Sequence, residues 1–379
     1  MTSNFRRVAT AVALVAAGIA AMPTANAGVA AKTKYPLVLV HGFIGFDNIL
    51  GVVNYFYQIP GALRDEGATV YIAQVNPSQT TEYRGEELNR QLDAWKAKDK
   101  VAKFNLIGHS HGGPTVRYSA ATRTDIASVS TMSGTHYGSL VADKILAGTT
   151  PDGGFDQAAT GGLKLIGWLT GAKDYQNADL KIALKALSAQ DAERFNTQYP
   201  AGRTAEKANG QYFYSYAGNK LKTNSYDVSD PLLAYTGAYY GTEANDGLVS
   251  PREAKWGKQI AMNLAWNHLD EINQVLGSIG KGPPDPGEPV PQMEPGKDPA
   301  AVRAERVARY GEEAADRLSE VDAQWAAWDR RLAAARAEWD RLQAAPNLSD
   351  SQKKDEMERY VNEHFQGKDV IRIKGLVRY

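Results

Sequence analysis

The chain has 379 residues, a formal net charge of zero and no cysteine. This length allows one large domain or two ordinary ones, and a hydrophobic content of 43% is typical of a globular protein. The balanced charge gives no basic field for nucleic acid and no acidic solvating tail. Because there is no cysteine, disulfides, thiol catalysis and a lipoprotein anchor are excluded.

The first 27 residues have the pattern of an export signal. Arg6 and Arg7 form a positive segment, residues 8–22 are an alanine-rich apolar run, and Ala25-Asn26-Ala27 is an A-x-A cleavage site. We therefore expect a secreted protein, cleaved after Ala27, that passes through a periplasmic intermediate. The alternative is an uncleaved membrane anchor, although the apolar run is short for a spanning helix.

From residue 34 to about residue 277, apolar runs of strand length alternate with helical stretches. This alternation predicts an α/β fold with a mostly parallel sheet and helices on both faces. The expected strands are residues 35–40, 68–73, 103–107 and 127–132, and the expected helices are 61–67, 82–95 and one that starts at 113.

The segment Gly108-His109-Ser110-His111-Gly112 lies between an expected strand and an expected helix. A serine with glycines two residues away on each side, in this context, is typical of a nucleophile elbow. The turn is so tight that a side chain at either glycine would collide with the neighbouring strand or helix. Ser110 is therefore the candidate nucleophile, and Pro114 fits the first turn of the following helix.

A serine nucleophile needs a histidine base and an acid that orients it, which in this arrangement follow the serine in the order acid, then histidine. Of the six histidines, only His268 has the right position in the chain. Asp246 lies on a glycine-containing turn before it and is the preferred acid, with Asp227 and Asp230 as competitors.

The oxyanion of an acyl-transfer intermediate needs two backbone N–H groups. His111 follows the nucleophile and supplies the first. The second comes from the loop His41-Gly42-Phe43 after the strand that ends at Val40, and Phe43 is the expected donor.

Residues 137–187 lie between the elbow and the acid, where lids are inserted in such folds. The apolar residues between 163 and 169 are expected to form either a mobile lid with a lipid-contact patch or an ordinary packed helix.

Residues 281–298 are rich in proline and glycine and are expected to be a semi-rigid linker. Beyond them, apolar residues recur at alternating spacings of three and four, which predicts a long helix with one apolar seam. These residues are Leu318, Val321, Trp325, Trp328, Leu332, Ala335, Trp339 and Leu342. Pro346 ends that helix, and Ser349 with Gln352 forms a capping box for a last one. The seam needs cover, either from the rest of the chain, which we favour, or in a coiled-coil dimer or helical hairpin.

Three segments closely resemble secreted bacterial triacylglycerol lipases of the Pseudomonas and Burkholderia type. They are residues 41–51 (HGFIGFDNILG), 108–114 (GHSHGGP) and 267–274 (NHLDEINQ). The resemblance covers about residues 34–280 and implies a lidded α/β-hydrolase domain, with Ser110, Asp246 and His268 as the catalytic triad.

The same resemblance implies a structural calcium ion near the catalytic histidine loop. Asp227 and Asp270 would be carboxylate ligands, with Gln274 and the carbonyl of Ser278 completing the shell, and oxygen ligands suit calcium. Val228 stands where proline is common in the family. The disulfide that many of these lipases carry is absent here.

The region 303–379, including Arg309–Leu318 and residues 347–350, resembles the C-terminal helical part of lipase-specific foldases, which are steric chaperones. The foldase membrane anchor and N-terminal mini-domain have no counterpart here. The implied partner is a foldase in trans or the chain's own helices in cis.

The sequence thus predicts a signal peptide (1–27), a lipase domain (28–280), a linker (281–298) and a helical foldase-like extension (299–379). The predicted function is hydrolysis of acylglycerol esters at a lipid–water interface through an acyl-enzyme. The alternatives are a carboxylesterase or polyester depolymerase with the same triad, or a non-catalytic chimera that binds lipase-folding partners.

Overall fold

The computed structural model describes residues 29–43, 55–148, 180–223, 227, 229–274 and 297–379. We call residues 29–274 the body and residues 297–379 the tail. The signal segment, the apolar stretch 163–169, most of the linker and Ser278 lie outside the described residues. None of the helices in these ranges combines the length and apolar character needed to cross a bilayer.

The body is built on a seven-stranded sheet in the order β2-β1-β3-β4-β6-β5, with β7 also paired to β6. All pairs are parallel except the short β5–β6 pair, so the prediction of a mostly parallel α/β sheet is confirmed. The strands are β1 (Leu37–Val40), β2 (Val70–Ala73), β3 (Phe104–His109), β4 (Ile126–Met132), β5 (Lys207–Ala208), β6 (Gln211–Gly218) and β7 (Lys258–Leu264).

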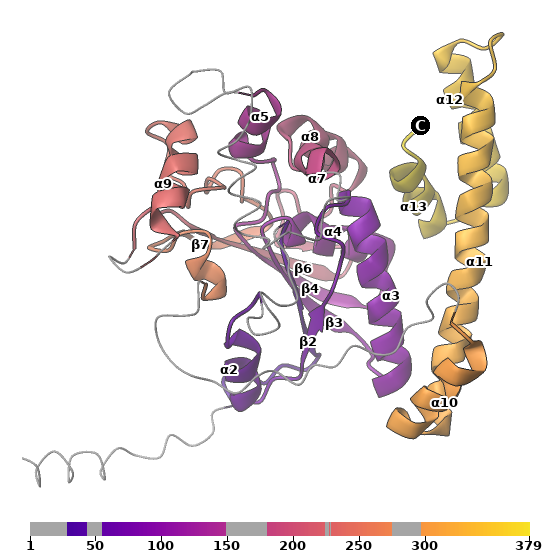
Figure 1. Cartoon of the computed structure of the whole chain (residues 1–379), viewed down its shortest axis with the longest axis horizontal. Helices are drawn as coiled ribbons and strands as arrows, with labels where there is room; N and C mark the ends of the chain where they lie inside the picture. The colour runs from indigo at the N-terminus through magenta and orange to yellow at the C-terminus, as the bar shows by residue number, and fades with distance from the viewer. Residues whose placement is uncertain (1–28, 44–54, 149–179, 224–226, 228, 275–296) are drawn as a thin grey trace, which may run out of the picture.

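The helices of the body connect these strands and flank the sheet (Figure 1). They are α2 (Ile59–Asp65), α3 (Thr81–Asp99), α4 (Gly112–Thr122), α5 (Leu140–Leu146), α7 (Leu180–Ala186), α8 (Ala189–Gln198) and α9 (Asp230–Gly237). The expected first four strands and three helices are all present, within a few residues of their predicted ends. Strands β6 and β7 were not predicted. Strand β7 lies at the sheet edge, its residues 258–260 are exposed, and its apolar run, Ile260-Ala261-Met262, is short.

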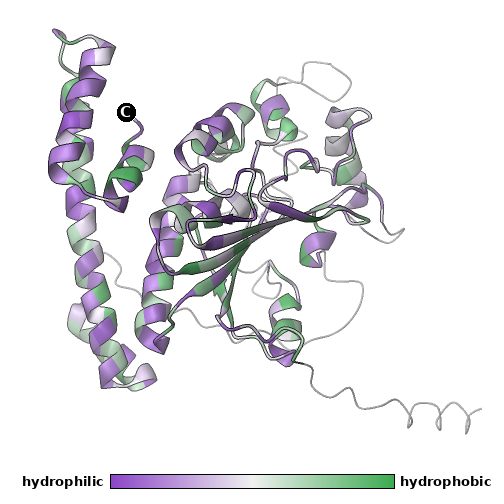
Figure 2. Cartoon of the chain, turned by 180° about the vertical axis from the view of Figure 1, so that it is seen from behind, coloured by the Kyte–Doolittle hydropathy of each residue, from purple (hydrophilic) through white to green (hydrophobic). Residues whose placement is uncertain are grey.

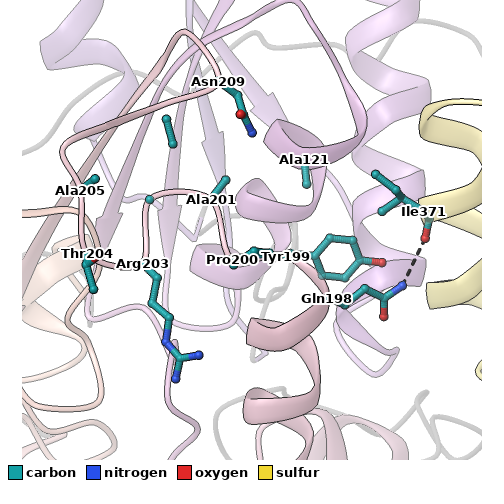
Figure 3. Close-up of a pocket in the computed structure, with 12 residues that line it drawn as sticks. Ala121, Gln198, Tyr199, Pro200, Ala201, Arg203, Thr204, Ala205, Asn209 and Ile371 are labelled. Carbon is teal, nitrogen blue, oxygen red and sulfur yellow. Dashed lines mark hydrogen bonds between the residues drawn. The ribbon is translucent and has the colours of Figure 1, made fainter.

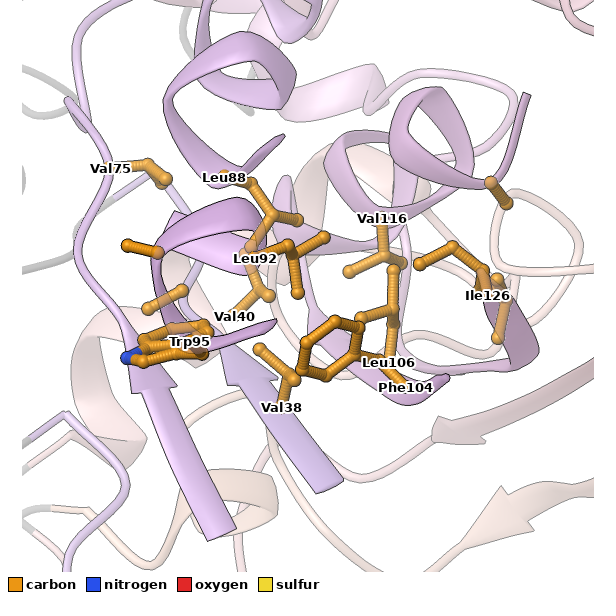
Figure 4. Packing of buried hydrophobic residues seen from close by; sticks show 14 of the residues in the cluster. Val38, Val40, Val75, Leu88, Leu92, Trp95, Phe104, Leu106, Val116 and Ile126 are labelled. Atoms are coloured by element: carbon orange, nitrogen blue, oxygen red, sulfur yellow. The ribbon is translucent and has the colours of Figure 1, made fainter. Parts of the chain in front are cut away.

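Side chains of β1 alternate between the two faces of the sheet, as strand geometry requires. Val38 and Val40 pack under α3 and α4, whereas Leu37 and Leu39 face the opposite side. Figure 4 shows the first of these clusters, in which Leu88, Leu92 and Trp95 of α3 lie over the strands. This core fixes the carboxyl ends of β1 and β3, where the loops that carry the candidate site begin.

The tail consists of four helices that stand beside α3 (Figure 1). They are α10 (Pro299–Tyr310), α11 (Glu312–Gln343), α12 (Asp350–His364) and α13 (Lys368–Val377). The predicted capping box is confirmed, because Ser349 and Gln352 bond reciprocally at the start of α12. Helix α13 was not predicted separately. Figure 2 shows that hydrophilic and hydrophobic segments alternate along α11.

The apolar seam of α11 is covered within the chain. Leu318 joins the core of the body beneath α3. Farther along, the seam packs against α12 and α13 in a second cluster. This cluster comprises Trp325, Trp328, Ala335, Leu342, Met357, Val361, Phe365 and Ile373. The tail therefore forms a hairpin whose α11 and α13 both contact α3.

Charged side chains of the tail meet charged side chains of the body along α3. The Arg372 guanidinium makes two hydrogen bonds with Glu86, at 2.9 and 2.5 Å, and lies 3.6 Å from the Trp328 ring centroid. Arg378 makes a 2.8 Å ion pair with Glu82, whose side chain is fully buried. Both carboxylates belong to the body, so the tail supplies part of their neutralisation.

A hollow of about 410 Å³ lies where α13 meets the loop after α8. Figure 3 shows Tyr199, Pro200 and Ala201 on one side of it and Ile371 of α13 on the other. Gln198 donates a 3.2 Å hydrogen bond to the Ile371 carbonyl across the junction. Ile371 is the one residue of the tail in its lining, and the other lining residues belong to the body.

We predict that Arg372→Glu destabilises the full chain by about 3 kcal/mol or more, because it removes the cation paired with Glu86 and places a like charge opposite it. Arg341→Glu is the matched control, since Arg341 is exposed and pairs only within α11, with Glu338. Urea unfolding would measure both variants, and the control should leave the midpoint unchanged. Equal midpoints for the two variants would mean that the Arg372 contact contributes nothing to stability.

Candidate active site

Ser110 lies at the turn between β3 and α4 with a backbone φ of +57°, a strained value for a residue that is not glycine. The flanking glycines are required by close contacts. A Cβ at Gly108 would lie 2.3 Å from the Gly112 carbonyl oxygen, and one at Gly112 would lie 2.2 Å from that of Val40. The sequence argument for a tight elbow is thus matched by the geometry, and strain of this kind is common at catalytic residues.

His268 and Asp246 form a buried pair next to the elbow. The His268 Nδ1 atom lies 2.8 Å from Asp246 Oδ2, and both side chains are almost fully buried. Asp246 Oδ1 accepts hydrogen bonds from the backbone N–H groups of Leu248 and Val249. The ring of His268 lies 4.5 Å, between centroids, from that of His109, the residue before Ser110.

The two competing aspartates face a different partner. The Asn267 side-chain amide donates 3.0 Å hydrogen bonds to both Asp227 and Asp230. Asp246 is therefore the one of the three carboxylates that the structure brings to His268.

The loop His41-Gly42-Phe43 lies directly beside the nucleophile. A Cβ at Gly42 would lie 2.7 Å from Ser110 Cβ and 3.1 Å from Ser110 Oγ. His111, the other expected oxyanion donor, is the N-cap residue of α4, so its backbone lies at the positive end of that helix. Both expected donors thus border Ser110.

A second hydrogen-bond chain runs beneath the catalytic pair and was missed by sequence reasoning. His109 Nδ1 lies 2.6 Å from the Tyr55 hydroxyl, and His109 Nε2 lies 3.1 Å from Glu271. Glu271 Oε1 also accepts from the Ser133 hydroxyl and the Gly218 N–H. Burial and then the Asp246 charge raise the pKa of Glu271 well above its usual value.

Within the described ranges, His109, His268 and Glu271 are the group of three whose potential ligand atoms lie closest, all within 4.8 Å. Each is already hydrogen-bonded to a protein group. In the sequence, Glu271 stands out only as a carboxylate three residues after His268. The sequence alone could not show that Glu271 contacts His109.

The remaining histidines are unsuited to act as the base. Burial lowers the pKa of His111 and His136 well below the usual value, with Arg84 and Arg117 respectively adding to the effect. The His111 ring lies against Thr81 of α3, 2.9 Å from its hydroxyl. His364 lies on α12 in the tail.

The expected calcium ligands Asp227 and Asp270 both contact Asn267. Asp227 accepts from its side-chain amide, and Asp270 accepts from its backbone N–H at 3.1 Å. Burial raises the pKa of Asp270, and the charges of Asp227 and Asp230 add to the rise. The Gln274 side-chain N–H donates a 3.1 Å hydrogen bond to the Tyr55 carbonyl. Among the described residues, Asn267 is thus the hydrogen-bond donor that Asp227, Asp230 and Asp270 share.

A serine at a strand-to-helix elbow of a parallel sheet, followed in the chain by an aspartate and a histidine that meet, defines the α/β hydrolases. Residues 35–258 match the alpha/beta hydrolase fold family, and residues 289–369 match the proteobacterial lipase chaperone protein family.

Three triacylglycerol lipases are similar over most of their length. The one from Vibrio cholerae serotype O1 is 41% identical over 259 residues, covering 65% of this chain and 82% of the relative. Those of Burkholderia plantarii and Pseudarthrobacter phenanthrenivorans are 34% and 33% identical, covering 74% and 68% of this chain and 92% and 94% of theirs. The chain therefore belongs to the triacylglycerol lipase family, and the resemblance inferred from its motifs is confirmed.

We predict that Gly42→Ala lowers ester hydrolysis by about 10-fold to 100-fold, because its methyl group would displace Ser110 or the oxyanion loop. Gly61→Ala in α2 is the control, since a Cβ there meets nothing within 4 Å. Rates on a soluble ester, together with melting temperatures, would compare the two variants. Unchanged hydrolysis by Gly42→Ala would show that the loop does not need this close approach.

Proposed function

We propose that the protein is an exported lipase that hydrolyses long-chain acylglycerols through an acyl-enzyme on Ser110. The observation that carries the proposal is the buried 2.8 Å contact between His268 and Asp246 beside a strained serine elbow. Membership of the triacylglycerol lipase family supports the substrate class. The signal pattern in residues 1–27 supports export, with the lipid–water interface as the site of action.

In this mechanism Ser110 attacks the ester carbonyl while His268 takes its proton. Asp246 holds the imidazole in the productive orientation and stabilises its charged form. The backbone N–H groups of Phe43 and His111 bind the oxyanion. His268 then returns the proton to the leaving alcohol and activates a water that releases the fatty acid.

We predict that Ser110→Ala lowers kcat by about 10⁴-fold or more, and that Asp246→Asn lowers it by about 10³–10⁴-fold. Asp230→Asn is the matched control, because Asp230 contacts Asn267 and not His268. The substrates would be a short soluble ester and an emulsified long-chain triacylglycerol.

Equal rates for wild type and Ser110→Ala would favour a non-catalytic chimera. Cleavage of short esters without cleavage of the emulsion would favour a carboxylesterase or a polyester depolymerase instead.

We also propose that calcium binds beside Asn267, held by Asp227 and Asp270, with the Gln274 and Ser278 carbonyls completing the shell. The ion would tie the loop that carries His268 to the segment before α9. The raised pKa of Asp270 supports this, because burial and then the neighbouring like charges make its ionisation costly, and a divalent cation would offset that cost.

Calcium at about 100 times its Kd should stabilise the wild-type fold by about 2–3 kcal/mol. We predict that chelation lowers the melting temperature of the wild type and that Asp270→Asn loses most of this response. Glu243→Gln, at a partly exposed carboxylate paired with Arg252, is the control and should keep this response. An equal calcium response in wild type and Asp270→Asn would rule out this site.

For the tail, we propose a foldase-like role in cis. It is supported by the family match of residues 289–369 and by the contacts of Arg372 and Arg378 with α3. If the role is correct, Arg372→Glu should also lower the yield of active enzyme on refolding, and more than it lowers the activity of protein already folded. A separate foldase in trans would be indicated if refolding of the full chain required one.

A further inference from the structure

His41 lies in the oxyanion loop, yet the catalytic mechanism does not use its side chain. The ring is buried and has a backbone contact at each nitrogen. The Val75 N–H donates to Nε2 at 3.2 Å, and Nδ1 lies 2.9 Å from the Gly42 carbonyl oxygen. A backbone amide can only donate, so Nε2 is the acceptor. The proton of the neutral ring is therefore on Nδ1, and Nδ1–H donates to the Gly42 carbonyl.

This carbonyl belongs to the peptide unit that also carries the Phe43 N–H. Because a trans peptide is planar, its C=O and N–H point in opposite directions. A hydrogen bond that holds the Gly42 oxygen against the His41 ring therefore turns the Phe43 N–H away from that ring. A Cβ on Gly42 would lie 2.7 Å from Ser110 Cβ and 3.1 Å from Ser110 Oγ, so the nucleophile adjoins Gly42.

The protonation state of His41 is fixed by its surroundings. Burial, with the nearby Arg84 charge adding to it, lowers the pKa of His41 to about 3. The ring therefore stays neutral over the range in which a serine hydrolase works, and a neutral ring keeps one donor and one acceptor.

The preceding peptide unit, between His41 and Gly42, is held by hydrogen bonds as well. Arg84 of α3, fully buried, donates a 2.6 Å hydrogen bond to the His41 carbonyl. Its Nε donates to the Thr115 hydroxyl, which in turn donates to the His111 carbonyl at 2.8 Å. The same guanidinium thus anchors the loop of one oxyanion donor and the helix end of the other.

We propose that His41 is a positioning residue for catalysis: its Nδ1–H sets the Gly42–Phe43 peptide so that the Phe43 N–H faces the oxyanion. The inference rests on the proposed function, in which Phe43 is an oxyanion donor. It assigns His41 a task in the transition state beyond packing of the loop.

Two isosteric variants of the full chain separate the two ring nitrogens. His41→Asn places an amide N–H where Nδ1 was and loses the acceptor for Val75. His41→Gln places its amide near the Nε2 position and loses the donor to Gly42. Each variant leaves one buried backbone group without its partner, so both should lower the melting temperature by a similar amount.

We predict that kcat falls by about 10-fold to 100-fold in His41→Gln and by no more than about 3-fold in His41→Asn, with KM unchanged in both. The inhibition constant of phenylboronic acid, whose tetrahedral serine adduct places an oxygen in the same hole, should rise by the same factor as kcat falls. Equal kcat values for the two variants would overturn the proposal, as would a loss in His41→Gln that KM accounts for.

A measurement on the wild type tests the proposal without relying on a folded variant. In protein labelled with ¹⁵N-histidine, the His41 resonances should report a proton on Nδ1 and a bare Nε2 between pH 5 and 9. A proton on Nε2, or titration in that range, would overturn the proposal. If the wild type hydrolysed no ester while His41 showed the expected tautomer, the proposed function would fail and the geometry of the loop would stand.

Discussion

Helix α3 carries buried charge on two faces, and both the catalytic loops and the tail depend on it. Helical spacing puts Glu82 and Glu86 on one face and turns Arg84 to the other. Arg84 holds the His41 carbonyl and, through Thr115, the start of α4. Glu86 pairs with Arg372 of α13, and Glu82 pairs with Arg378, which directly follows α13. The helix therefore lies between the site and the tail, and it contacts both through charges that are costly to leave unpaired.

The tail completes the partners of two buried carboxylates of the body. Within the body, Glu86 has the Tyr118 hydroxyl as a partner, and Glu82 has Arg194. Arg372 and Arg378 complete these clusters from the tail. Because the tail is covalently joined to the body, its docking is intramolecular and its effective concentration is set by the linker. A foldase-like segment in cis thus needs little intrinsic affinity to stay docked.

The elbow and the catalytic histidine could be predicted because they depend on local chemistry. Gly108 and Gly112 are needed by a tight turn, and His268 is singled out by its order in the chain. Tyr55 and Glu271 could not be predicted, because they meet at His109 from positions far apart in the sequence. Contacts of this kind follow from the packing of the sheet, and no local pattern records them.

In the tail, too, local features could be predicted and long-range contacts could not. Its seam and capping box follow from spacing and were predicted, whereas the surface that covers them was left open between cis and trans. Helix α13 buries Ile373 against α11, and Arg372 within it and Arg378 just after it pair with carboxylates of α3. Both halves of this contact lie in segments with mixed charge, so the sequence of either half does not indicate its partner.

Four imidazoles lie at or around the site, and they differ in their partners. His41, His109 and His111 all surround the nucleophile, and burial lowers the pKa of each far below the usual value. Arg84 adds to the effect at His41 and His111, and His268 adds to it at His109. His268 differs because its Nδ1 lies 2.8 Å from the Asp246 carboxylate, which holds the ring in one orientation. Three neutral rings thus serve as fixed hydrogen-bonding groups, and the fourth is left free to carry the proton of Ser110.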